Sequence, residues 1–401
     1  MINNQIVILA KGHGFSLAFD ATNTKCFFMA KILKSYGLNV AVLSSVHYQD
    51  ESFPKKIGRY NGIKYFMPSV HPSGSSALQR YLHKLIYIIQ VLCFVIYLKK
   101  KWSRVHLIFD DNSTPFPLLL ILSWLGIIEL IFNLEEWPIA KKGSLGRKFL
   151  SHLFIILAFK CCNKIVCVSS YLVNKANKYN KAANIIKLPA LADFSNSKHN
   201  SLNIGNGRDE LSFLYCGNVG YSEVIFAIIE AYENACMLNK QAKLSLILVL
   251  HGNQILLNKI SDYVYSSKYL IKIKTFLSEI DLYTEYSEAS VLLAPLRLTI
   301  QDEARFPQKI AEYTSLAKPI ITTNVGDIKY YFKSEKSAIF LSDFSVDELT
   351  KAMIFTTDNA GNLKEFGYRG NLVGRQYFNY MQYVSVFGDL VTLRSFNGCE
   401  F

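Results

Sequence analysis

Residues 305–327 have the sequence RFPQKIAEYTSLAKPIITTNVGD, the clearest local pattern in this chain of 401 residues. Pro307 is typical of the first turn of a helix, which we predict to run to about Leu316. Lys318 and the proline after it end that helix, and the β-branched run at residues 320–323 predicts a strand. A helix that leads into an apolar strand is the unit from which parallel sheets are built.

The same alternation of β-rich runs and helical patterns extends over the rest of the chain. Strands are expected at residues 5–10, 40–44, 107–110, 127–133, 164–168, 213–216, 244–250, 291–295, 320–323 and 338–341. A polar stretch rich in Ser, Asn and Gly at residues 193–210 is typical of an interdomain linker. We therefore predict an α/β protein with two Rossmann-like domains. They are residues 1–195 and residues 205–375, with a helical segment at residues 376–401 that we expect to pack back on the first domain.

Composition favours an anionic partner and a membrane surface. Hydrophobic residues make up 50% of the chain, and 44 Lys and Arg against 31 Asp and Glu give a formal net charge of +13. Residues 85–98 are almost all apolar and are followed by three lysines and Trp102, yet they are too short to span a bilayer. The region from Leu85 to Trp102 is predicted to lie on an anionic membrane surface. A buried crossover helix with a cationic C-terminal end is an alternative and is compatible with that prediction.

The cysteines and the first residues indicate a reducing compartment. The chain has eight cysteines, mostly inside apolar stretches, and no signal-peptide pattern at its start, so we expect a cytoplasmic protein. Cys161, Cys162 and Cys167 lack the spacing of a zinc site and are predicted to be buried thiols.

The start of the helix predicted from Pro307 to about Leu316 carries the chemistry. Lys309 lies in its first turn and Arg305 just before it, where cations oppose the helix dipole. A diphosphate bound to free backbone N–H groups and to these two side chains would resolve that conflict. Glu312 lies one turn deeper on the same face and is suited to accept the hydroxyl protons of a ribose. A local Lys309–Glu312 pair on a solvated helix is the alternative.

This segment resembles the donor-binding signature of family-four (group 1) retaining glycosyltransferases of GT-B fold, commonly close to P-x-K-x-x-E-Y-x-A-x-G-K-P-V-V-x-T-x-x-G. The match includes Pro307, Lys309, Glu312, Tyr313, Lys318, Pro319, Thr323 and Gly326, with Ala317 where glycine is usual. An acidic residue common in the family falls at Ala304 here, which leaves the adjacent Glu303 as a candidate.

Other segments resemble the family in the same order. Residues 213–220, FLYCGNVG, are similar to the strand and glycine loop that open the second domain. The Arg and Lys that usually follow this loop are replaced by residues 221–223, YSE, so phosphate binding is expected to depend on Lys309, Arg305 or Arg297. The resemblance implies donor-binding residues Gly217, Asn218, Gly220, Arg297, Glu303, Arg305, Phe306, Pro307, Lys309 and Glu312.

Two segments of the first half are candidates for the acceptor side. The loop after the first strand contains Gly12, His13, Gly14 and Asn23 and resembles the family's first acceptor-side loop, although His13 alone suits an ordinary loop residue. Residues 134–138, LEEWP, follow a predicted strand, where α/β sheets bind ligands. Either Glu135 or Glu136 is expected to face the cleft, and an acidic turn is the alternative.

The resemblance implies a two-domain enzyme whose parallel sheets face across a cleft. Lys309, Glu312, Glu136 and Glu135 are its candidate catalytic residues. It implies sugar transfer from a nucleoside-diphosphate sugar with retention of configuration and without a metal or other cofactor. It also implies a polyprenyl-linked saccharide acceptor in the synthesis of a surface polysaccharide such as O-antigen or capsule, at the inner face of the plasma membrane. The alternatives are a nucleotide-sugar epimerase or hydrolase of the same fold, and a non-catalytic basic protein that binds membranes or nucleic acid.

Overall fold

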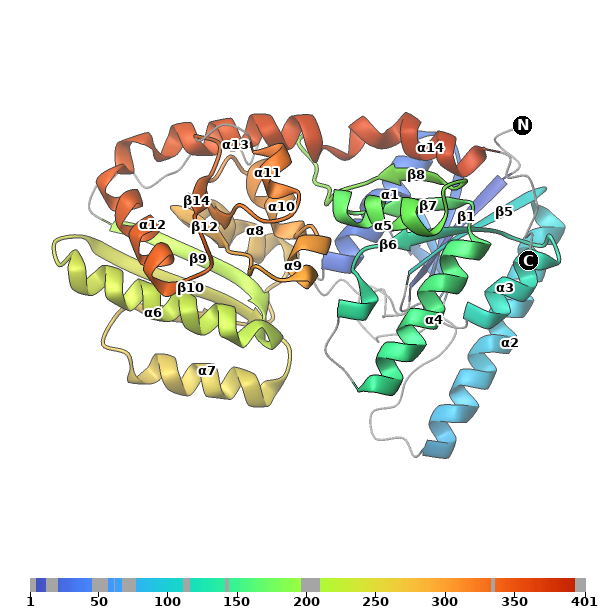
Figure 1. Cartoon of the computed structure of the whole chain (residues 1–401), viewed down its shortest axis with the longest axis horizontal. Coiled ribbons are helices and arrows are strands. Elements are labelled where there is room, and N and C mark those ends of the chain that lie inside the picture. Colours follow the sequence, from blue (N-terminus) through green and yellow to red (C-terminus); the bar gives the residue numbers. More distant parts are fainter. Residues whose placement is uncertain are drawn as a thin grey trace. The chain divides into compact units, whose positions relative to one another are not determined.

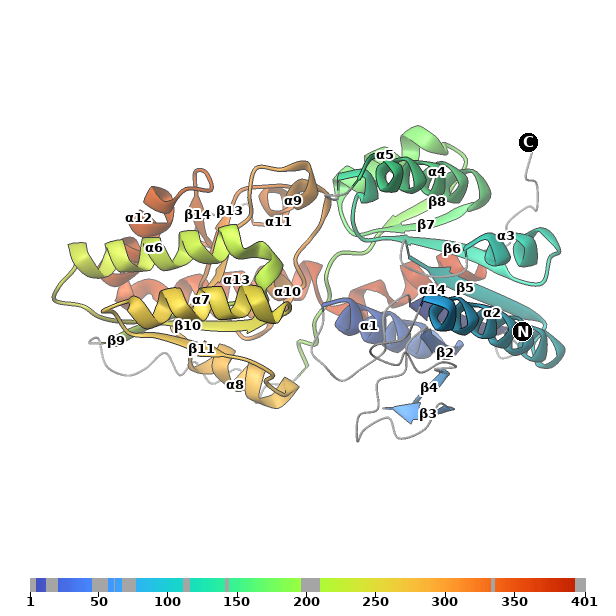
Figure 2. The same cartoon turned by 90° about the horizontal axis from the view of Figure 1, so that it is seen from below.

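The structure, a computed structural model, describes residues 5–11, 21–44, 57–60, 62–66, 77–110, 116–140, 144–195, 210–332 and 336–393. Contacts between Cα atoms divide the chain into two compact units. Unit 1 comprises Met1–Pro189 and Tyr380–Phe401, and unit 2 comprises Ala190–Asn379. Each unit is built on one sheet with helices on both of its faces (Figures 1 and 2).

Unit 1 contains an eight-stranded sheet in the order β3-β4-β2-β1-β5-β6-β7-β8. Its neighbouring strands are parallel except for the antiparallel pair β3 and β4. The strands are β1 (Gln5–Lys11), β2 (Asn39–Ser44), β3 (Ile57–Tyr60), β4 (Ile63–Phe66), β5 (Arg104–Phe109), β6 (Glu129–Leu134), β7 (Lys164–Cys167) and β8 (Asn184–Lys187). The central strands are buried apolar runs, as expected where helices cover both faces of a parallel sheet.

Helices lie on both faces of this sheet. They are α1 (Ala21–Ser35), α2 (Ala77–Lys101), α3 (Phe116–Trp124), α4 (Leu145–Cys161), α5 (Ser170–Tyr179) and α14 (Val384–Thr392). In Figure 1, α2, α3 and α4 lie below the sheet, and α1 and α14 lie above it. Because crossover connections are right-handed, helices lie on opposite faces when the chain adds strands toward opposite edges of the sheet.

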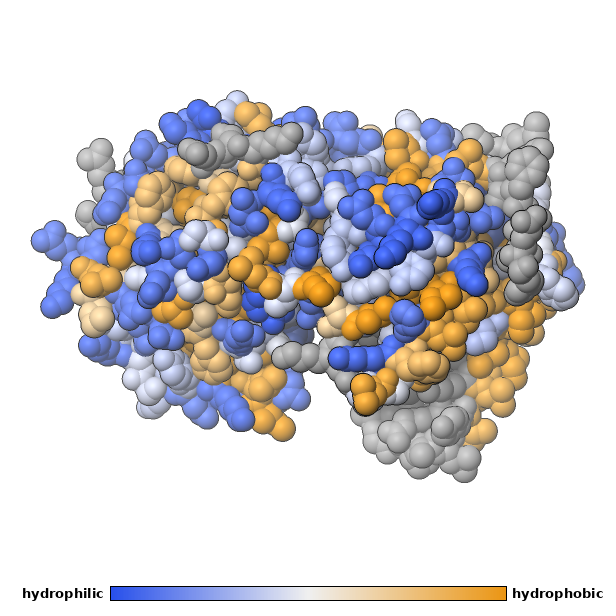
Figure 3. Space-filling model, in the orientation of Figure 1, coloured by the Kyte–Doolittle hydropathy of each residue, from blue (hydrophilic) through white to orange (hydrophobic). Residues whose placement is uncertain are grey.

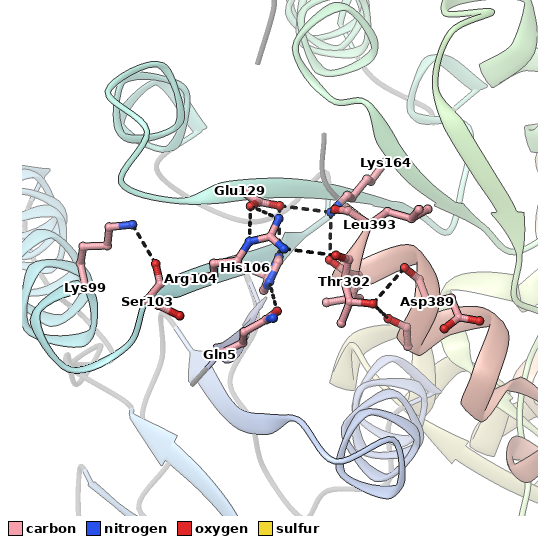
Figure 4. A network of polar contacts seen from close by, with 12 residues as sticks. Gln5, Lys99, Ser103, Arg104, His106, Glu129, Lys164, Asp389, Thr392 and Leu393 are labelled. Carbon is pink, nitrogen blue, oxygen red and sulfur yellow. Dashed lines mark hydrogen bonds and ion pairs between the residues drawn. The ribbon is translucent and has the colours of Figure 1, made fainter. Parts of the chain in front are cut away.

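A buried polar network holds α14 against the sheet (Figure 4). The Lys164 ammonium donates hydrogen bonds to the Val391 and Leu393 carbonyls at the end of α14, and its nitrogen lies 3.1 Å from a Glu129 carboxylate oxygen. Arg104 also pairs with Glu129 and donates to the Thr392 carbonyl, so these cations cap the helix C-terminus. The surrounding cations and His106 outweigh burial and lower the pKa of Glu129 to about 2.

Unit 2 contains a six-stranded sheet in the order β11-β10-β9-β12-β13-β14, and all its neighbouring strands are parallel. The strands are β9 (Glu210–Asn218), β10 (Lys243–His251), β11 (Ile271–Lys274), β12 (Val291–Ala294), β13 (Ile320–Thr323) and β14 (Ile339–Leu341). The helices are α6 (Ser222–Leu238), α7 (Gln254–Ser266), α8 (Glu279–Glu288), α9 (Ile300–Ala304), α10 (Gln308–Ser315), α11 (Ile328–Tyr331), α12 (Val346–Asp358) and α13 (Leu363–Tyr377). Figure 2 shows α6 and α7 on one face of the sheet and α8 on the other.

The turn after α10 explains the departure from glycine at Ala317. Ala317 has φ +54°, the left-handed conformation that usually ends a helix on glycine, and its N–H donates to the Thr314 carbonyl. Helix α13 packs directly on this turn at Gly367, where a Cβ atom would lie 2.0 Å from the Ala317 carbonyl oxygen. The absence of a side chain at Gly367 therefore allows α13 to approach the helix that carries Lys309 and Glu312.

The ten strands predicted from the sequence are all present within one to three residues of the expected bounds. Strands β3, β4, β8 and β11 were not predicted. Residues 85–98 belong to the helix α2, as expected, and residues 116–132 form α3 and enter β6. None of the helices that the structure describes is both long and apolar enough to cross a bilayer.

Candidate functional site

The C-terminal end of β9 and the helices that follow it form one side of the candidate site in unit 2. Strand β9 ends at Asn218, whose side-chain oxygen accepts a hydrogen bond from the Gly220 N–H at 2.8 Å. This bond shapes the short 3-10 helix Val219–Tyr221 before α6 begins. Gly252, at the end of the neighbouring β10, has φ +126°, and a Cβ atom there would lie 2.9 Å from Val219. The glycine loop is therefore tightly packed against the end of β10.

Lys309 reaches the glycine loop from the first turn of α10. Its ammonium donates to the Cys216 carbonyl, next to Gly217, and lies 4.2 Å from the centre of the Tyr215 ring. Helix α10 begins after Pro307, and no side chain caps its N-terminus. Burial, together with the positive charge of Arg305, lowers the pKa of Lys309 to about 8. An anion placed here would stabilise the protonated lysine.

Glu312 lies one turn further along α10 and is almost fully buried. Burial raises the pKa of Glu312 to about 7, although the Gln308 side chain and the charge of Lys309 act in the opposite direction. Within the part of the chain that the structure describes, no ion pair joins Lys309 to Glu312. The local pair considered above is therefore not formed.

Asp302 organises the two arginines of the site. Its carboxylate is fully buried and accepts from the Arg297 side chain at 2.8 and 3.2 Å and from the Arg297 backbone N–H at 2.9 Å. The Arg305 guanidinium lies 2.8 Å from the other side of the same carboxylate. Burial alone would raise the pKa of Asp302, but these bonds and charges hold it below its ordinary value. Asp302 therefore remains ionised and fixes both guanidinium groups.

Tyr221 lies between these arginines and the glycine loop. The Arg305 and Arg297 guanidinium carbons lie 4.5 Å and 5.2 Å from the centre of its ring. Arg305 also donates a hydrogen bond to the Tyr221 hydroxyl. The residue that follows the glycine loop is thus a tyrosine and not a cation. Its side chain positions two arginines that come from a distant part of the sequence.

The structure places the other predicted donor residues around this cluster. Glu303 is half-buried in α9, and its backbone lies against Gly326, where a Cβ atom would be 2.9 Å from the Glu303 carbonyl oxygen. Phe306 is buried in an aromatic cluster, with ring centres 5.3 Å from Tyr331 and 5.1 Å from Phe378. Phe306 therefore supports the start of α10 from within the core of unit 2.

The predicted acceptor-side residues belong to unit 1. Glu135 follows β6, where it accepts from Asn133 at 2.9 Å and lies 3.5 Å from the Lys25 nitrogen in the first turns of α1. Lys25 is buried and makes no hydrogen bond in the described structure. Glu136 is half-buried. Asn23 is in the first turn of α1, whereas Gly12, His13 and Gly14 lie outside the described residues.

Sequence reasoning missed Asp302, Tyr221, Gln308 and Lys25. Asp302 had a local signal, because it is flanked by Arg297 and Arg305, each within one helical turn or two. Tyr221 and Arg305 are 84 residues apart, so no spacing in the sequence could indicate their contact. Among the described residues, no group of three or more His, Cys, Asp or Glu side chains is placed to hold a metal ion.

Comparisons with known proteins bear on the family and the fold of the chain. Residues 211–359 match the family model for glycosyl transferases group 1. A comparison with curated proteins found no sequence match.

Among solved structures, sucrose-phosphate synthase from Thermosynechococcus elongatus has a TM-score of 0.71 at 13% identity, over 97% of this chain and 98% of that chain. HepE from Anabaena in complex with UDP and glucose has a TM-score of 0.68 at 13% identity, over 96% and 98%. A glycosyltransferase from Rickettsia africae has a TM-score of 0.67 at 12% identity, over 98% and 100%. Residues 211–359 therefore match the group 1 glycosyltransferase family, and the whole chain has the GT-B fold of these glycosyltransferase structures.

Proposed function

We propose that this enzyme transfers a sugar from a nucleoside-diphosphate sugar to a polyprenyl-linked saccharide, with retention of configuration, in surface-polysaccharide synthesis. The donor-binding part of this proposal rests on the group of cations at one end of the unit 2 sheet. Arg297, Arg305 and Lys309 converge there beside the glycine loop and the uncapped start of α10. Backbone N–H groups and fixed cations are the usual ligands of a diphosphate.

Each group has a distinct role in this proposal. Cleavage of the donor bond leaves negative charge on the diphosphate, and preorganised donors that face this charge lower the barrier. Lys309 and Arg305 bind the leaving diphosphate, and Arg297 completes the positive surface. The Glu312 carboxylate accepts the ribose hydroxyl protons from its buried position. These cations take the place of a divalent metal, so transfer is expected to continue in the presence of a chelator.

The acceptor belongs to unit 1 in this proposal. Glu135, held by Asn133 and Lys25 after β6, is the better placed of the two glutamates to receive an acceptor hydroxyl. In a retaining reaction the departing phosphate itself takes that proton, so no protein nucleophile is required. The lysines at the end of α2, within the region from Leu85 to Trp102, are proposed to contact anionic lipid at the inner face of the plasma membrane.

The donor assignment is tested by Lys309→Ala and Glu312→Ala. Each change should reduce sugar transfer at least about a hundredfold while the protein stays folded, because each removes a contact to the donor. Lys329→Ala and Glu288→Ala, at exposed positions of the same unit, are matched controls that should retain full activity. Wild-type activity in both site variants would refute the assignment.

The donor is found by thermal shift with a panel of nucleotide sugars. UDP sugars come first, because HepE was solved with UDP and glucose. A ligand at about a hundred times its dissociation constant stabilises a protein by about 2.7 kcal/mol, which gives a clear shift. Incubation with the stabilising sugar alone separates transfer from the rival activities, since an epimerase or hydrolase would convert it without an acceptor.

A further inference from the structure

Helix α4 of unit 1 exposes a continuous apolar stripe. Leu145, Phe149, Leu153 and Leu157 recur every four residues and therefore lie along one side of the helix. Leu145 is 87% exposed and Phe149 is 68% exposed, whereas Ile155 and Phe159 on the other side are buried against the sheet. A surface helix that faces water normally carries polar residues on its outward side.

Helix α3 continues the stripe. Its Trp124 is 75% exposed and Ile121 is 54% exposed. The two helices are in contact, because the ring centres of Phe116 in α3 and Phe154 in α4 lie 4.6 Å apart. We call the exposed residues together the apolar ridge: Ile121, Trp124, Leu145, Phe149, Leu153 and Leu157. Figure 3 shows hydrophobic residues gathered on this side of unit 1, over α2, α3 and α4. Patches of this kind mark interaction surfaces.

The charges around the ridge identify the kind of partner. Helices α2, α3 and α4 contain no aspartate or glutamate in their sequences. Exposed lysines flank the apolar side chains: Lys148 and Lys160 on α4, and Lys99, Lys100 and Lys101 at the end of α2. A second copy of this chain would bring the same positive rim against itself and be repelled. An anionic phospholipid surface meets both the apolar stripe and its cationic border.

We propose that the apolar ridge inserts into the headgroup and upper acyl region of an anionic phospholipid bilayer, with the flanking lysines on lipid phosphates. This inference rests on the membrane association in the proposed function, but it assigns insertion to α3 and α4, outside the region from Leu85 to Trp102. The α2 lysines then supply long-range attraction, and the ridge supplies the apolar contact that holds the enzyme on the membrane.

Vesicle sedimentation of the full chain tests this assignment. The probes are vesicles of phosphatidylcholine mixed with phosphatidylglycerol, and vesicles of phosphatidylcholine alone. The double variant Phe149→Ser and Leu153→Ser should bind the mixed vesicles at least about thirtyfold more weakly than the wild type, because partitioning scales with buried apolar area. Ile255→Ser with Ile280→Ser, which removes two exposed apolar residues from unit 2, is the matched control and should bind normally.

Trp124 provides a second measurement that does not depend on a destabilising change. The chain has three tryptophans, and Trp137 is buried, so Trp102→Phe leaves Trp124 as the exposed reporter. Its emission should shift to shorter wavelength on addition of mixed vesicles, and brominated lipid should quench it. An unchanged emission spectrum would overturn the inference.

Two further outcomes distinguish the possible failures. Normal vesicle binding by the double variant, with binding lost in Lys99→Gln, Lys100→Gln and Lys101→Gln, would overturn insertion by α3 and α4. Self-association of the wild type that the double variant abolishes, without an effect on vesicles, would also overturn it. Nucleotide binding is measured separately on the same samples, so a wild type that inserts but binds no nucleotide would refute the proposed sugar transfer and leave the ridge intact.

Discussion

Nucleotide affinity should fall steeply as the pH rises through 8, because Lys309 then loses its charge. Burial lowers the pKa of Lys309 to about 8, and a bound diphosphate raises it again by opposing that effect. The diphosphate itself is fully ionised in this range, since the second pKa of a phosphate is about 6. Binding above pH 8 must therefore take up one proton, and the protein rather than the ligand is its acceptor.

The magnitude follows from the size of this shift. If the complex restores the ordinary lysine pKa of about 10.4, affinity should fall about tenfold for each pH unit above 8 and about a hundredfold over two units. The corresponding loss of binding free energy is about 2.7 kcal/mol. Below pH 8 the ammonium is already protonated, so its contribution to affinity is constant there.

Isothermal titration with UDP between about pH 7 and pH 10, in buffers of different ionisation enthalpy, counts the protons taken up. Lys309→Arg should bind UDP with no slope from this position, because the guanidinium stays charged. Lys309→Met should bind weakly at every pH. A flat wild-type profile above pH 8 would refute the reasoning. A slope that persists in Lys309→Arg would assign the proton to Lys318, whose pKa burial also lowers to about 8.

Four other changes have defined expected results. Glu312→Gln should weaken UDP binding about tenfold and abolish the loss of affinity that the wild type shows as the pH falls below 7, where the Glu312 carboxylate is protonated; titration at pH 6 and pH 8 compares the two proteins. Asp302→Asn should lower the free energy of unfolding of unit 2 by about 3 kcal/mol, because it leaves the partly buried Arg305 without its counter-ion and Arg297 with only the exposed Glu223; an unchanged urea midpoint would contradict this. Lys164→Met should destabilise the protein by about 3 kcal/mol through Glu129 and the end of α14, and the wild type should lose stability in acid as Glu129 is protonated between about pH 4.5 and pH 2. Gly367→Ala should cost about 2 kcal/mol or more, since its Cβ would meet the Ala317 carbonyl, and thermal melting with Gly361→Ala as the control measures it.

Most of the strands that the sequence predicts lie inside a sheet, although the edge strand β14, whose sequence IFL is apolar, is predicted as well. β10 and β12 lie inside a parallel sheet with both faces covered, so their sequences are nearly continuous apolar runs. The missed strands β8 and β11 lie at sheet edges and include lysine, as in NIIK and IKIK. These two edge strands pair on one side only, and their charged residues discourage pairing with other chains, so a search for apolar runs passes over them.

Some residues of the candidate site can be predicted from the nearby sequence, and others depend on contacts between distant segments. Lys309 and Glu312 are predictable because a proline, a helix period and a following strand determine where they lie. Asp302 also had a local signal, because its partners Arg297 and Arg305 lie five and three residues from it in the sequence. Tyr221 depends on the approach of two segments that are distant in the sequence. The periodicity of the sequence cannot predict this contact, because the order of the strands in the sheet brings the two segments together.

The electrostatics of unit 2 indicate a site that is complete only with an anion. Arg297, Arg305 and Lys309 are held close together; Asp302 pairs with both arginines, and the exposed Glu223 lies 3.5 Å from Arg297. Lys309 is not neutralised by Glu312, because the two form no ion pair in the described structure and burial favours the neutral form of Glu312. The remaining repulsion and burial appear in the lowered pKa of Lys309. A diphosphate would remove both costs at once, so the same arrangement that strains the free protein favours the leaving group of a nucleotide sugar.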